Sequence, residues 1–458
     1  MRIRASFAIS MAALLLAVWT LQARRNPGAN STPLSPAVEL ASDRSTSEQA
    51  IRFLEKRIQA DHEDFIAHNK LAGYYLQRVR ETGDLAYLNL AARASRASLA
   101  SMPAEKNSSG LGALAQVEFS SHEFAASRDH AKRLAELEPG KSYPQQLLGD
   151  ALLELGDYEA ARGAFFQMER LGGINVLTRV AIEQRTARMA LLQGDPRSAL
   201  KHMRDATALA LAMPHPPRET VAWCRWQLGE IAFSMGDYAA AEQHEQDALT
   251  TFPDYFKALA SLGRIRAARG DFSDAIGLYQ RAVQWFPDPA FVAALGDLYK
   301  LAGREQDAAA QYALVEAITR LNEASGNLYN RQQALYFADH DLNPQLAYVS
   351  AVTEYNIRKD IYGADTVAWT ALKAGKLREA NASMQEALRL GTQDSKLFYH
   401  AGMIARAIGD FASARYNLKR ALMLNPRFDP LQATIAESAL SSLAQEEQQS
   451  LPTKSWTN

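Results

Sequence analysis

The sequence has 458 residues, with 50 basic and 51 acidic side chains and a formal net charge of −1. This length exceeds that of one ordinary compact domain, so several domains or a repeat array are expected. Hydrophobic residues make up 47% of the chain and charged residues 22%, a composition that excludes a largely disordered protein. The balanced charge argues against a nucleic-acid partner. The single cysteine, Cys224, excludes an internal disulfide and any site built from several thiolates.

The N-terminal segment, residues 1–25, has the pattern of a signal peptide or an N-terminal signal anchor. Arg2 and Arg4 precede an apolar run over residues 5–21 that carries no charge. A basic region followed by an apolar region is typical of a secretory signal, but two further arginines directly after the run disfavour cleavage. An uncleaved anchor and a buried first helix are the alternatives. We therefore expect an exported protein, periplasmic or extracellular, or one anchored by a single pass through residues 5–21.

Residues 26–47 are expected to form a flexible spacer. They are rich in Pro and Ser and show little periodic hydrophobicity, as in linkers between folded parts. From residue 48 onward the apolar residues recur at helical spacing, and residues 48–60 are expected to form an amphipathic helix at the start of the folded body.

The rest of the chain is organised by a recurring turn signal, a Gly-Asp-aromatic triplet. It occurs as Gly156-Asp157-Tyr158, Gly236-Asp237-Tyr238, Gly270-Asp271-Phe272 and Gly409-Asp410-Phe411. The triplets sit in a common frame, which in one unit consists of Gly229, Gly236, Ala241, Ala248 and Pro253, and in the next of Gly263, Gly270, Ala275, Ala282 and Pro287. A fixed period of this kind indicates an array of small structural repeats.

This spacing predicts pairs of antiparallel helices. A Gly just past a helix end supplies the left-handed conformation that ends the first helix, the Asp can cap the second helix, and the Pro stops the second helix before the next unit. The first Gly of the frame lets the two helices approach closely, and the Ala positions face the neighbours. Since one pair cannot bury its apolar face alone, the pairs are expected to stack into one continuous core.

The frame of about 34 residues, with its Leu-Gly, Gly-Asp-aromatic, Ala, Ala and Pro positions, resembles the tetratricopeptide repeat (TPR). The resemblance covers most of the chain and implies an all-α fold, a right-handed superhelical solenoid of antiparallel helix pairs. Units are expected to start near Asn69, Ser108, Ser142, Val180, Ala222, Phe256, Pro289, Leu328, Ile361 and Ser395.

Irregular spacings divide the expected array. A Pro-rich insert is expected to form a protruding loop between the first two sub-arrays, and a second irregularity, near Gly326, follows a long helix expected from Gln306 to about Glu323. The expected divisions are an N-terminal sub-array over 48–212, the insert over 213–221, a central sub-array over 222–325, a C-terminal sub-array over 326–429, and a polar capping helix with a tail over 430–458.

No arrangement of side chains in the sequence points to catalysis. The nine histidines form no His-Glu-x-x-His motif, and no Gly-x-Ser-x-Gly motif occurs. The nearest candidate is Asp339-His340-Asp341, which could bind a metal, although a turn in which Asp caps the next helix is the favoured interpretation. Cys224 is expected to be a packed small side chain, and His400 a packed or exposed one. We therefore expect no enzyme activity, no metal and no cofactor.

The resemblance to TPR proteins places the candidate partner-binding groove on the concave face, which the first helices of the pairs form. The corresponding residues of the central units are Trp223, Trp226, Glu230, Phe233, Lys257, Arg264, Asp297 and Lys300. Exposed aromatic rings beside cations would anchor a peptide or an extended polymer. In the structural alternative, Trp223 packs against the Pro-rich insert and Trp226 fills the seam between helices. The Lys, Asn and Arg set with which some TPR proteins hold a C-terminal carboxylate is not reproduced in consecutive units.

The sequence thus favours a non-catalytic protein–protein interaction scaffold or adaptor, outside the cytoplasm or at the membrane. The expected partner is a protein or peptide rather than a nucleic acid, with membrane attachment through the N-terminal segment if that segment is retained. The alternative is an accessory ligand-binding subunit of an envelope polysaccharide or metal-uptake system, since exposed aromatic side chains also suit sugars.

Overall fold

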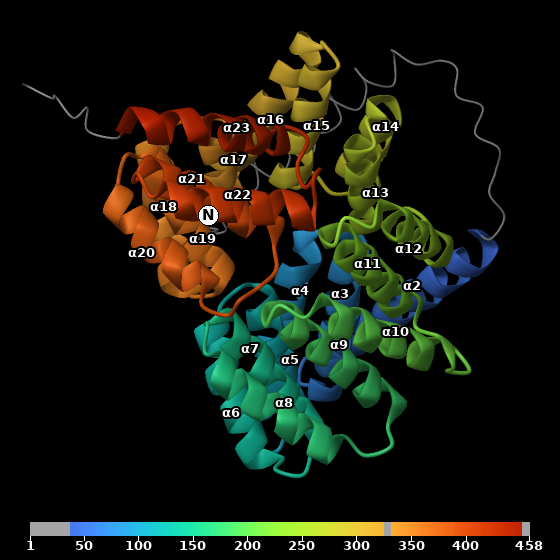
Figure 1. The fold of residues 1–458 in the computed structure, drawn as a ribbon. Coiled ribbons are helices and arrows are strands. Elements are labelled where there is room, and N and C mark those ends of the chain that lie inside the picture. Colours follow the sequence, from blue (N-terminus) through green and yellow to red (C-terminus); the bar gives the residue numbers. More distant parts are fainter. Residues whose placement is uncertain (1–36, 325–330, 451–458) are drawn as a thin grey trace, which may run out of the picture. The chain divides into compact units, whose positions relative to one another are not determined.

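The computed structural model describes residues 37–324 and 331–450. These residues form α-helices joined by loops, with no strands (Figure 1). By its internal contacts the chain divides into residues 1–48 and 49–458, and of the first part the structure describes only the beginning of helix α2, Ala37–Ala60. The apolar run at 5–21 lies outside the described residues. None of the described helices is both long and apolar enough to span a membrane.

Helix α2 shortens the expected spacer. The helix begins at Ala37, so the prediction of a flexible spacer over 26–47 is wrong for its second part. Pro36 is the last residue that would break a helix, and no Pro or Gly occurs in α2. The Ser and Thr residues of this segment lower helix propensity by less than about 0.7 kcal/mol each, which does not prevent a helix.

The helices that follow form consecutive antiparallel pairs, and Figure 1 shows them packed side by side. The pairs are α3 Phe65–Thr82 with α4 Leu85–Ser101, α5 Ser108–Ser120 with α6 Phe124–Leu137, α7 Ser142–Glu154 with α8 Tyr158–Gly172, α9 Val176–Leu192 with α10 Pro196–Leu211, α11 Arg218–Ser234 with α12 Tyr238–Thr251, α13 Phe256–Ala268 with α14 Phe272–Trp285, α15 Pro289–Leu301 with α16 Glu305–Ala324, α17 Arg331–Asp339 with α18 Pro344–Ile357, α19 Ile361–Lys373 with α20 Leu377–Leu388, and α21 Ser395–Ala407 with α22 Phe411–Leu424, followed by α23 Gln432–Ser450.

The starts of the first helices follow the repeat frame closely. Helices α5, α7, α13, α15, α19 and α21 begin at the residues where the frame places a unit start. Helices α3, α9 and α11 begin one helical turn earlier, at Phe65, Val176 and Arg218. Part of the irregular spacing between units is therefore an additional turn of helix rather than a longer loop.

The Gly-Asp turns have the predicted geometry. Gly236 has a φ of 75° and Gly270 a φ of 83°, values that favour glycine. The carboxylate of Asp237 accepts a hydrogen bond from the Ala240 N–H at 3.0 Å and so caps α12. Equivalent caps are made by Asp157 on α8, Asp271 on α14 and Asp410 on α22. These caps confirm that the triplet ends one helix and begins the next.

The glycine inside each first helix permits close packing of the pair. A Cβ atom at Gly263 would lie 2.8 Å from the Tyr279 ring, and one at Gly402 would lie 2.7 Å from Leu418. Both distances are too short for a side chain, so these positions need glycine for the approach of the second helix.

The apolar core continues across the Pro-rich segment. Only residues 212–217 lie between α10 and α11, so the predicted insert over 213–221 is too long, and its last residues form the first turn of α11. Met203 and Ala210 of α10 pack in one buried cluster with Val221 and Cys224 of α11. Apolar side chains on both sides of the loop therefore share one core. The division into two sub-arrays at this point stays a prediction.

The end of the array is covered by α23. The long helix expected near 306–323 is α16, and residues 325–330 lie outside the described residues. Helix α23 is less polar than expected on its inner face, where Ala433, Ala436, Ala439 and Leu443 are buried against α21 and α22. This helix therefore covers the apolar face of the last pair, as the terminal element of a repeat array does.

Candidate partner-binding groove

Two tryptophans on the first helix α11 form the centre of the candidate groove. Their ring centroids are 6.3 Å apart with an interplanar angle of 66°, an edge-to-face contact. Trp223 is half-buried and packs against the apolar core of α9–α11. Trp226 is also half-buried, and its indole N–H donates to the Ser261 hydroxyl at 2.9 Å. Each ring is thus held by the fold while part of its surface stays accessible.

Lys257, the second residue of α13, places its ammonium group against these rings. Its Nζ lies 5.1 Å from the centroid of the Trp226 ring and 5.8 Å from that of Phe256. Among the described residues no carboxylate lies within ion-pair distance of it. Burial lowers the pKa of Lys257; the charge of Glu219 opposes this shift and that of Arg80 adds to it. Lys257 is therefore a partly desolvated cation that two ring faces and the more distant charge of Glu219 stabilise.

Glu230 and Arg264 are engaged with each other. The Arg264 guanidinium donates to Glu230 Oε1 at 2.6 Å and lies 4.2 Å from the centroid of the Phe233 ring. The Ser261 hydroxyl also donates to Glu230. Phe233 itself is buried, packed on Tyr238 in the core of α11–α13. The expectation that Phe233 is an exposed groove aromatic is therefore wrong, because Arg264 and the core cover its ring.

A buried carboxyl group that the sequence did not single out lies beside this cluster. Glu245 of α12 is fully buried and has no hydrogen-bond partner in the described residues. Burial raises its pKa well above the ordinary value, with a further contribution from the charge of Glu230. Gly229 makes room for it, since a Cβ there would lie 2.1 Å from Glu245 Oε1. In the sequence, its position between Ala241 and Ala248, on the face of α12 that packs inward, was the feature that could have indicated a buried carboxyl group.

The two remaining groove candidates lie on α15. Asp297 accepts a hydrogen bond from the Tyr312 hydroxyl at 2.8 Å and contacts His340 Nε2 at 2.7 Å, so it is engaged within the fold. Lys300 is exposed. Within the described part of the chain no hydrogen bond, ion pair or ring contact joins either residue to the cluster of Trp223, Trp226, Glu230, Phe233, Lys257 and Arg264.

The Asp339-His340-Asp341 motif links neighbouring helix pairs. Asp339 accepts a hydrogen bond from the Trp369 indole N–H at 2.7 Å, His340 contacts Asp297, and Asp341 pairs with Lys373 at 2.7 Å. The three side chains thus have three different partners. The predicted helix cap is wrong, since Asn343 occupies the N-cap position of α18 and no side chain caps that helix.

Two other residues that the sequence raised are packed. Cys224 is fully buried, and burial raises the pKa of its thiol to about 11, which confirms the structural interpretation. His400 is fully buried, contacts Asp365 Oδ1 through Nδ1 at 2.8 Å, and stacks on Trp369 with centroids 4.2 Å apart.

Among the described residues, one group of side chains has the composition of a metal site. Ligand atoms of Glu183, His202 and Asp205 lie within 4.8 Å of one another. His202 Nδ1 contacts Glu183 at 2.7 Å, and Asp205 pairs with Lys201 at 2.8 Å. Protein partners therefore satisfy these groups as they stand.

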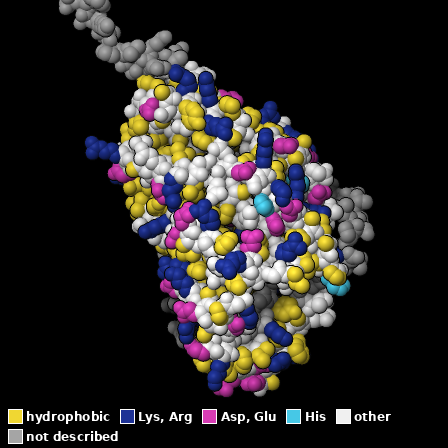
Figure 2. All heavy atoms as spheres, turned by 60° about the horizontal axis from the view of Figure 1, so that its bottom comes forward, with side chains coloured by type: hydrophobic (Ala, Val, Ile, Leu, Met, Phe, Trp, Pro, Cys, Tyr) yellow, Lys and Arg dark blue, Asp and Glu magenta, His cyan; other side chains and the backbone are white. Residues whose placement is uncertain are grey.

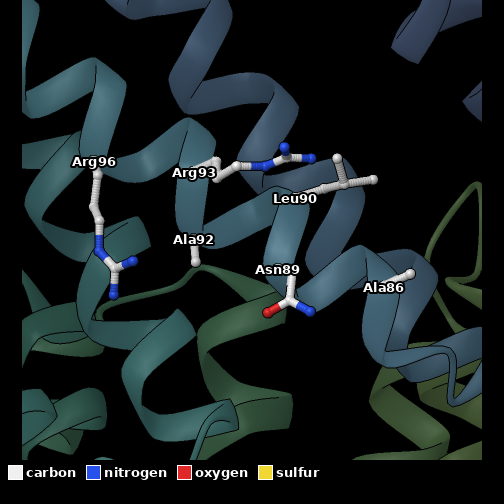
Figure 3. A pocket seen from close by; sticks show the side chains of 6 residues that line it. All are labelled: Ala86, Asn89, Leu90, Ala92, Arg93 and Arg96. Carbon is white, nitrogen blue, oxygen red and sulfur yellow. The ribbon is translucent and has the colours of Figure 1, made fainter. Parts of the chain in front are cut away.

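A surface hollow of about 540 Å³ lies along α4 (Figure 3). Its lining residues all belong to that helix and are Ala86, Asn89, Leu90, Ala92, Arg93 and Arg96. Arg93 and Arg96 are exposed. Because a single helix face supplies the whole lining, the hollow lacks the converging groups of a small-molecule site.

On the face that Figure 2 shows, the surface has no large patch of side chains of one charge. Basic and acidic side chains are interspersed there with hydrophobic ones, in keeping with the net charge of −1.

Comparison with known proteins identifies the repeats. Tetratricopeptide repeat models match residues 232–298, and also 113–172 and 368–432. The chain is 30% identical over 172 residues to the TPR repeat-containing protein YpiA of Bacillus subtilis (strain 168), a match that covers 36% of this chain and 38% of YpiA. The chain thus matches well under half the length of that relative.

Similar solved structures share low sequence identity with this chain. The structure of the human IFIT1 dimer with PPP-AAAA is 12% identical to this chain, and the TM-score is 0.43. The match covers 94% of the IFIT1 chain and 82% of this one. Yeast Tom70 is 14% identical to this chain, and the TM-score is 0.39. The match covers 97% of the Tom70 chain and 90% of this one. The sequence matches and the capped helix pairs show that the chain is a tetratricopeptide-repeat protein with an all-α solenoid fold.

Proposed function

We propose that the protein is a non-catalytic scaffold that holds a segment of a protein partner against α11 and α13. The observation that carries the proposal is the contact between Lys257 and Trp226. A partly desolvated ammonium group without a carboxylate partner gains a favourable interaction when a ligand supplies an acidic group. The adjoining indole surface would contribute apolar contact, and Trp is prominent among residues that dominate binding energies.

A peptide segment fits this surface better than a sugar chain. Trp223 and Trp226 meet edge to face, so they do not offer two parallel ring faces in a row on which sugar rings could stack. The hydroxyl of Ser261 and the carboxylate of Glu230 are committed to internal hydrogen bonds. The accessible chemistry is therefore a half-buried cation over the Trp226 ring, which suits an acidic and apolar peptide.

The proposal includes a location outside the cytoplasm or at the membrane. Its support is the basic and then apolar pattern of residues 1–25 in the sequence. Sequencing the N-terminus of the mature protein from membrane and soluble fractions tests it: a chain that begins at Met1 and occurs in the cytoplasm would contradict the proposed location.

Peptides selected on the full chain test the binding site. A peptide chosen from a displayed random library is expected to bind Trp226→Ala and Lys257→Ala variants about tenfold more weakly than the unaltered protein, as for central interface residues. Lys132→Ala is the control, because Lys132 is exposed on α6. Equal affinity for all variants, measured by fluorescence anisotropy, would overturn the proposed site.

A further inference from the structure

Turns in the first half of the array contact segments far away in the sequence. The Ile361 N–H donates to the Tyr158 hydroxyl at 2.9 Å across 203 positions, and the Thr392 hydroxyl donates to the Leu192 carbonyl at 2.5 Å across 200 positions. An ordinary repeat array contacts only its neighbours. This array therefore has a second set of interfaces, in addition to the stacking of neighbouring pairs.

Glycines at the turns permit these contacts, because backbone meets backbone there. A Cβ atom at Gly156 would lie 2.1 Å from the Lys359 carbonyl oxygen, and one at Gly194 would lie 2.4 Å from that of Gly391. Gly375 has a φ of 73°, close to the 77° of Gly156, but no described atom outside its own turn lies within 4 Å of the corresponding point. Glycine at position 156 thus serves the close approach as well as its own turn.

The spacing of these approaches is constant when it is counted in helix pairs. The turn of the first pair, α3–α4, meets the end of the sixth, and the turn of the fifth pair, α11–α12, meets the end of the tenth. We call these contacts the seam, and its opposing residues are Gly83 with Phe286, Gly156 with Lys359, Gly194 with Gly391 and Gly236 with Leu424. The constant offset shows that the chain completes one superhelical turn and that the next turn rests on it. Figure 1 shows α7 and α8 beside α19 and α20, on opposite sides of the seam.

Donors on one side of the seam bond to the carbonyl ends of first helices on the other. The Asn425 side-chain amide donates to the Phe233 carbonyl at 2.7 Å, as the Thr392 hydroxyl does to Leu192. Phe233 and Leu192 lie in the last turns of α11 and α9, where carbonyl groups have no partner within the helix. Residues of the second superhelical turn therefore cap helices of the first.

The third residue of the Gly-Asp-aromatic triplet differs between turns inside and outside the seam. The two triplets in the seam end in Tyr158 and Tyr238, and both hydroxyls bond across it, at 2.9 and 2.5 Å. The two triplets outside the seam end in Phe272 and Phe411, which have no hydroxyl. In the described part of the chain nothing lies within 4 Å of a Cβ atom at the glycines of these two. The tyrosine hydroxyl thus distinguishes a turn that joins the seam from one that does not.

The charges along the seam allow its two sides to separate. Arg358 pairs with Glu154 across the seam and, at 2.7 Å, with Asp360 on its own side. Arg331 pairs with Asp360 and with Glu354, each at 3.1 Å. When Glu154 moves away, two arginines and two carboxylates remain together. The electrostatic penalty of separation is therefore smaller than for a buried ion pair that loses its only partner.

The seam is also narrower than the interfaces between neighbouring helices. Among the described helices, those that pack along their lengths are close neighbours in the sequence, whereas turns and helix ends meet across the seam. Apolar burial there centres on Tyr158 and Leu192, which share a buried cluster with Ile361 and Leu397. Since less apolar surface is buried, less free energy opposes separation at the seam than within a helix pair.

We propose that the seam is a latch. The array opens along it in a single step, from a compact form in which one superhelical turn rests on the other to an extended form in which every helix pair stays folded. The step is single because the packing of neighbouring pairs holds each side of the seam together, so the caps, the ion pair and the tyrosine bonds separate at once. This inference does not depend on the groove proposed above.

Hydrogen exchange of the unaltered full chain tests the single step. The amides of Ile361 and Arg427 donate across the seam to the hydroxyls of Tyr158 and Tyr238, at 2.9 and 3.2 Å. Both amides are expected to exchange through one common opening, at least about tenfold more often than amides at the centres of α7 and α19, and with the same dependence on urea. Protection equal to that of the helix centres would overturn the latch.

A double variant, Tyr158→Phe with Tyr238→Phe, tests the tyrosine bonds. It removes two hydroxyls from the seam and gives these turns the residue type of the free ones. The radius of gyration in X-ray scattering is expected to increase, and exchange at Ile361 and Arg427 to become about tenfold faster, with helix content unchanged. The control is Tyr75→Phe with Tyr312→Phe, because these hydroxyls bond to Glu55 and Asp297 outside the seam, each at 2.8 Å.

Glu154→Arg is a second route to the extended form, since it places a third arginine beside Arg358 and Arg331. The same increase in radius of gyration is expected. Folded variants that keep the dimensions and the protection of the unaltered protein would overturn the latch. A loss of helix content in step with the expansion would also overturn it, because the seam would then separate only when the helix pairs unfold.

Discussion

Asp297 and His340, 43 positions apart, are joined by a contact of 2.7 Å between Oδ1 and Nε2. The other ring nitrogen of His340, Nδ1, lies 2.8 Å from the Tyr336 carbonyl oxygen. Both nitrogens therefore face acceptors, which favours the protonated imidazolium. Burial lowers the pKa of His340, but the bond and charge of Asp297 and the Tyr336 carbonyl outweigh burial and raise it.

Substitution of His340 is expected to remove a pH-dependent contribution to stability. Because the pKa is raised in the folded state, the contribution is complete below the unfolded pKa of about 6.5 and is lost as pH rises through the folded pKa. His340→Asn should lower the free energy of unfolding by about 2 kcal/mol at pH 6 and by less at pH 9. Urea unfolding at both pH values measures this, with the exposed His215→Asn as control; an equal loss at both pH values would contradict the charged state.

Replacement of Glu245 is expected to stabilise the protein at neutral pH. Its pKa is raised in the folded state, so stability falls as pH rises from the unfolded pKa towards the folded one. Glu245→Gln removes that loss and should raise the free energy of unfolding by about 1 kcal/mol at pH 8, with little change at pH 4. Parallel stability curves for the variant and the unaltered protein over this range would show that Glu245 is not a buried neutral acid.

Lys257→Met is expected to separate stability from binding. Methionine keeps much of the aliphatic length but removes a desolvated charge that lacks a carboxylate partner, so the free energy of unfolding should rise by about 0.5–1 kcal/mol. Affinity for a selected acidic peptide should fall at the same time. A variant that loses both stability and affinity would indicate that Lys257 supports the fold rather than a ligand.

Asn425→Ala is expected to loosen a region nearly two hundred positions away. The buried Asn425 side chain donates to the Phe233 carbonyl at 2.7 Å and accepts from the Tyr238 hydroxyl at 2.5 Å. Its removal should cost about 1–3 kcal/mol and speed amide exchange at the turn between α11 and α12. Hydrogen exchange by mass spectrometry measures this; faster exchange confined to the end of α22 would show that the two regions are not coupled.

The local parts of the fold were predictable from the sequence. Gly236 and Asp237 determine a turn and a cap through their own backbone and side-chain chemistry, with no help from distant residues. The frame therefore located the helix starts at Phe256 and Ser395 and the close packing at Gly263. The first part of α2 is not evident from the sequence, because its Ser and Thr residues are as common in linkers as in helices, although no Pro or Gly occurs between Pro36 and the end of the helix.

The candidate site was less predictable because it depends on neighbours. The frame assigned Phe233 to the groove, yet Arg264 covers its ring. It gave no sign that Asp297 bonds to His340, since that contact joins α15 to the end of α17. The contact between Glu154 and Arg358 depends on the total rotation of the array between them. Each helix pair adds a small rotation, and no local sequence pattern determines the total.

The backbone approach at Gly156 has a consequence for how this array can change in length. Ordinary solenoids gain or lose a repeat with little effect beyond the new neighbours. Here a helix pair added or removed between Gly156 and Lys359 would bring a different turn opposite Gly156 and a different charge opposite Glu154. The approach of Gly156 to Lys359 therefore depends on the number of helix pairs between them, and a duplication within this stretch is expected to break the contact.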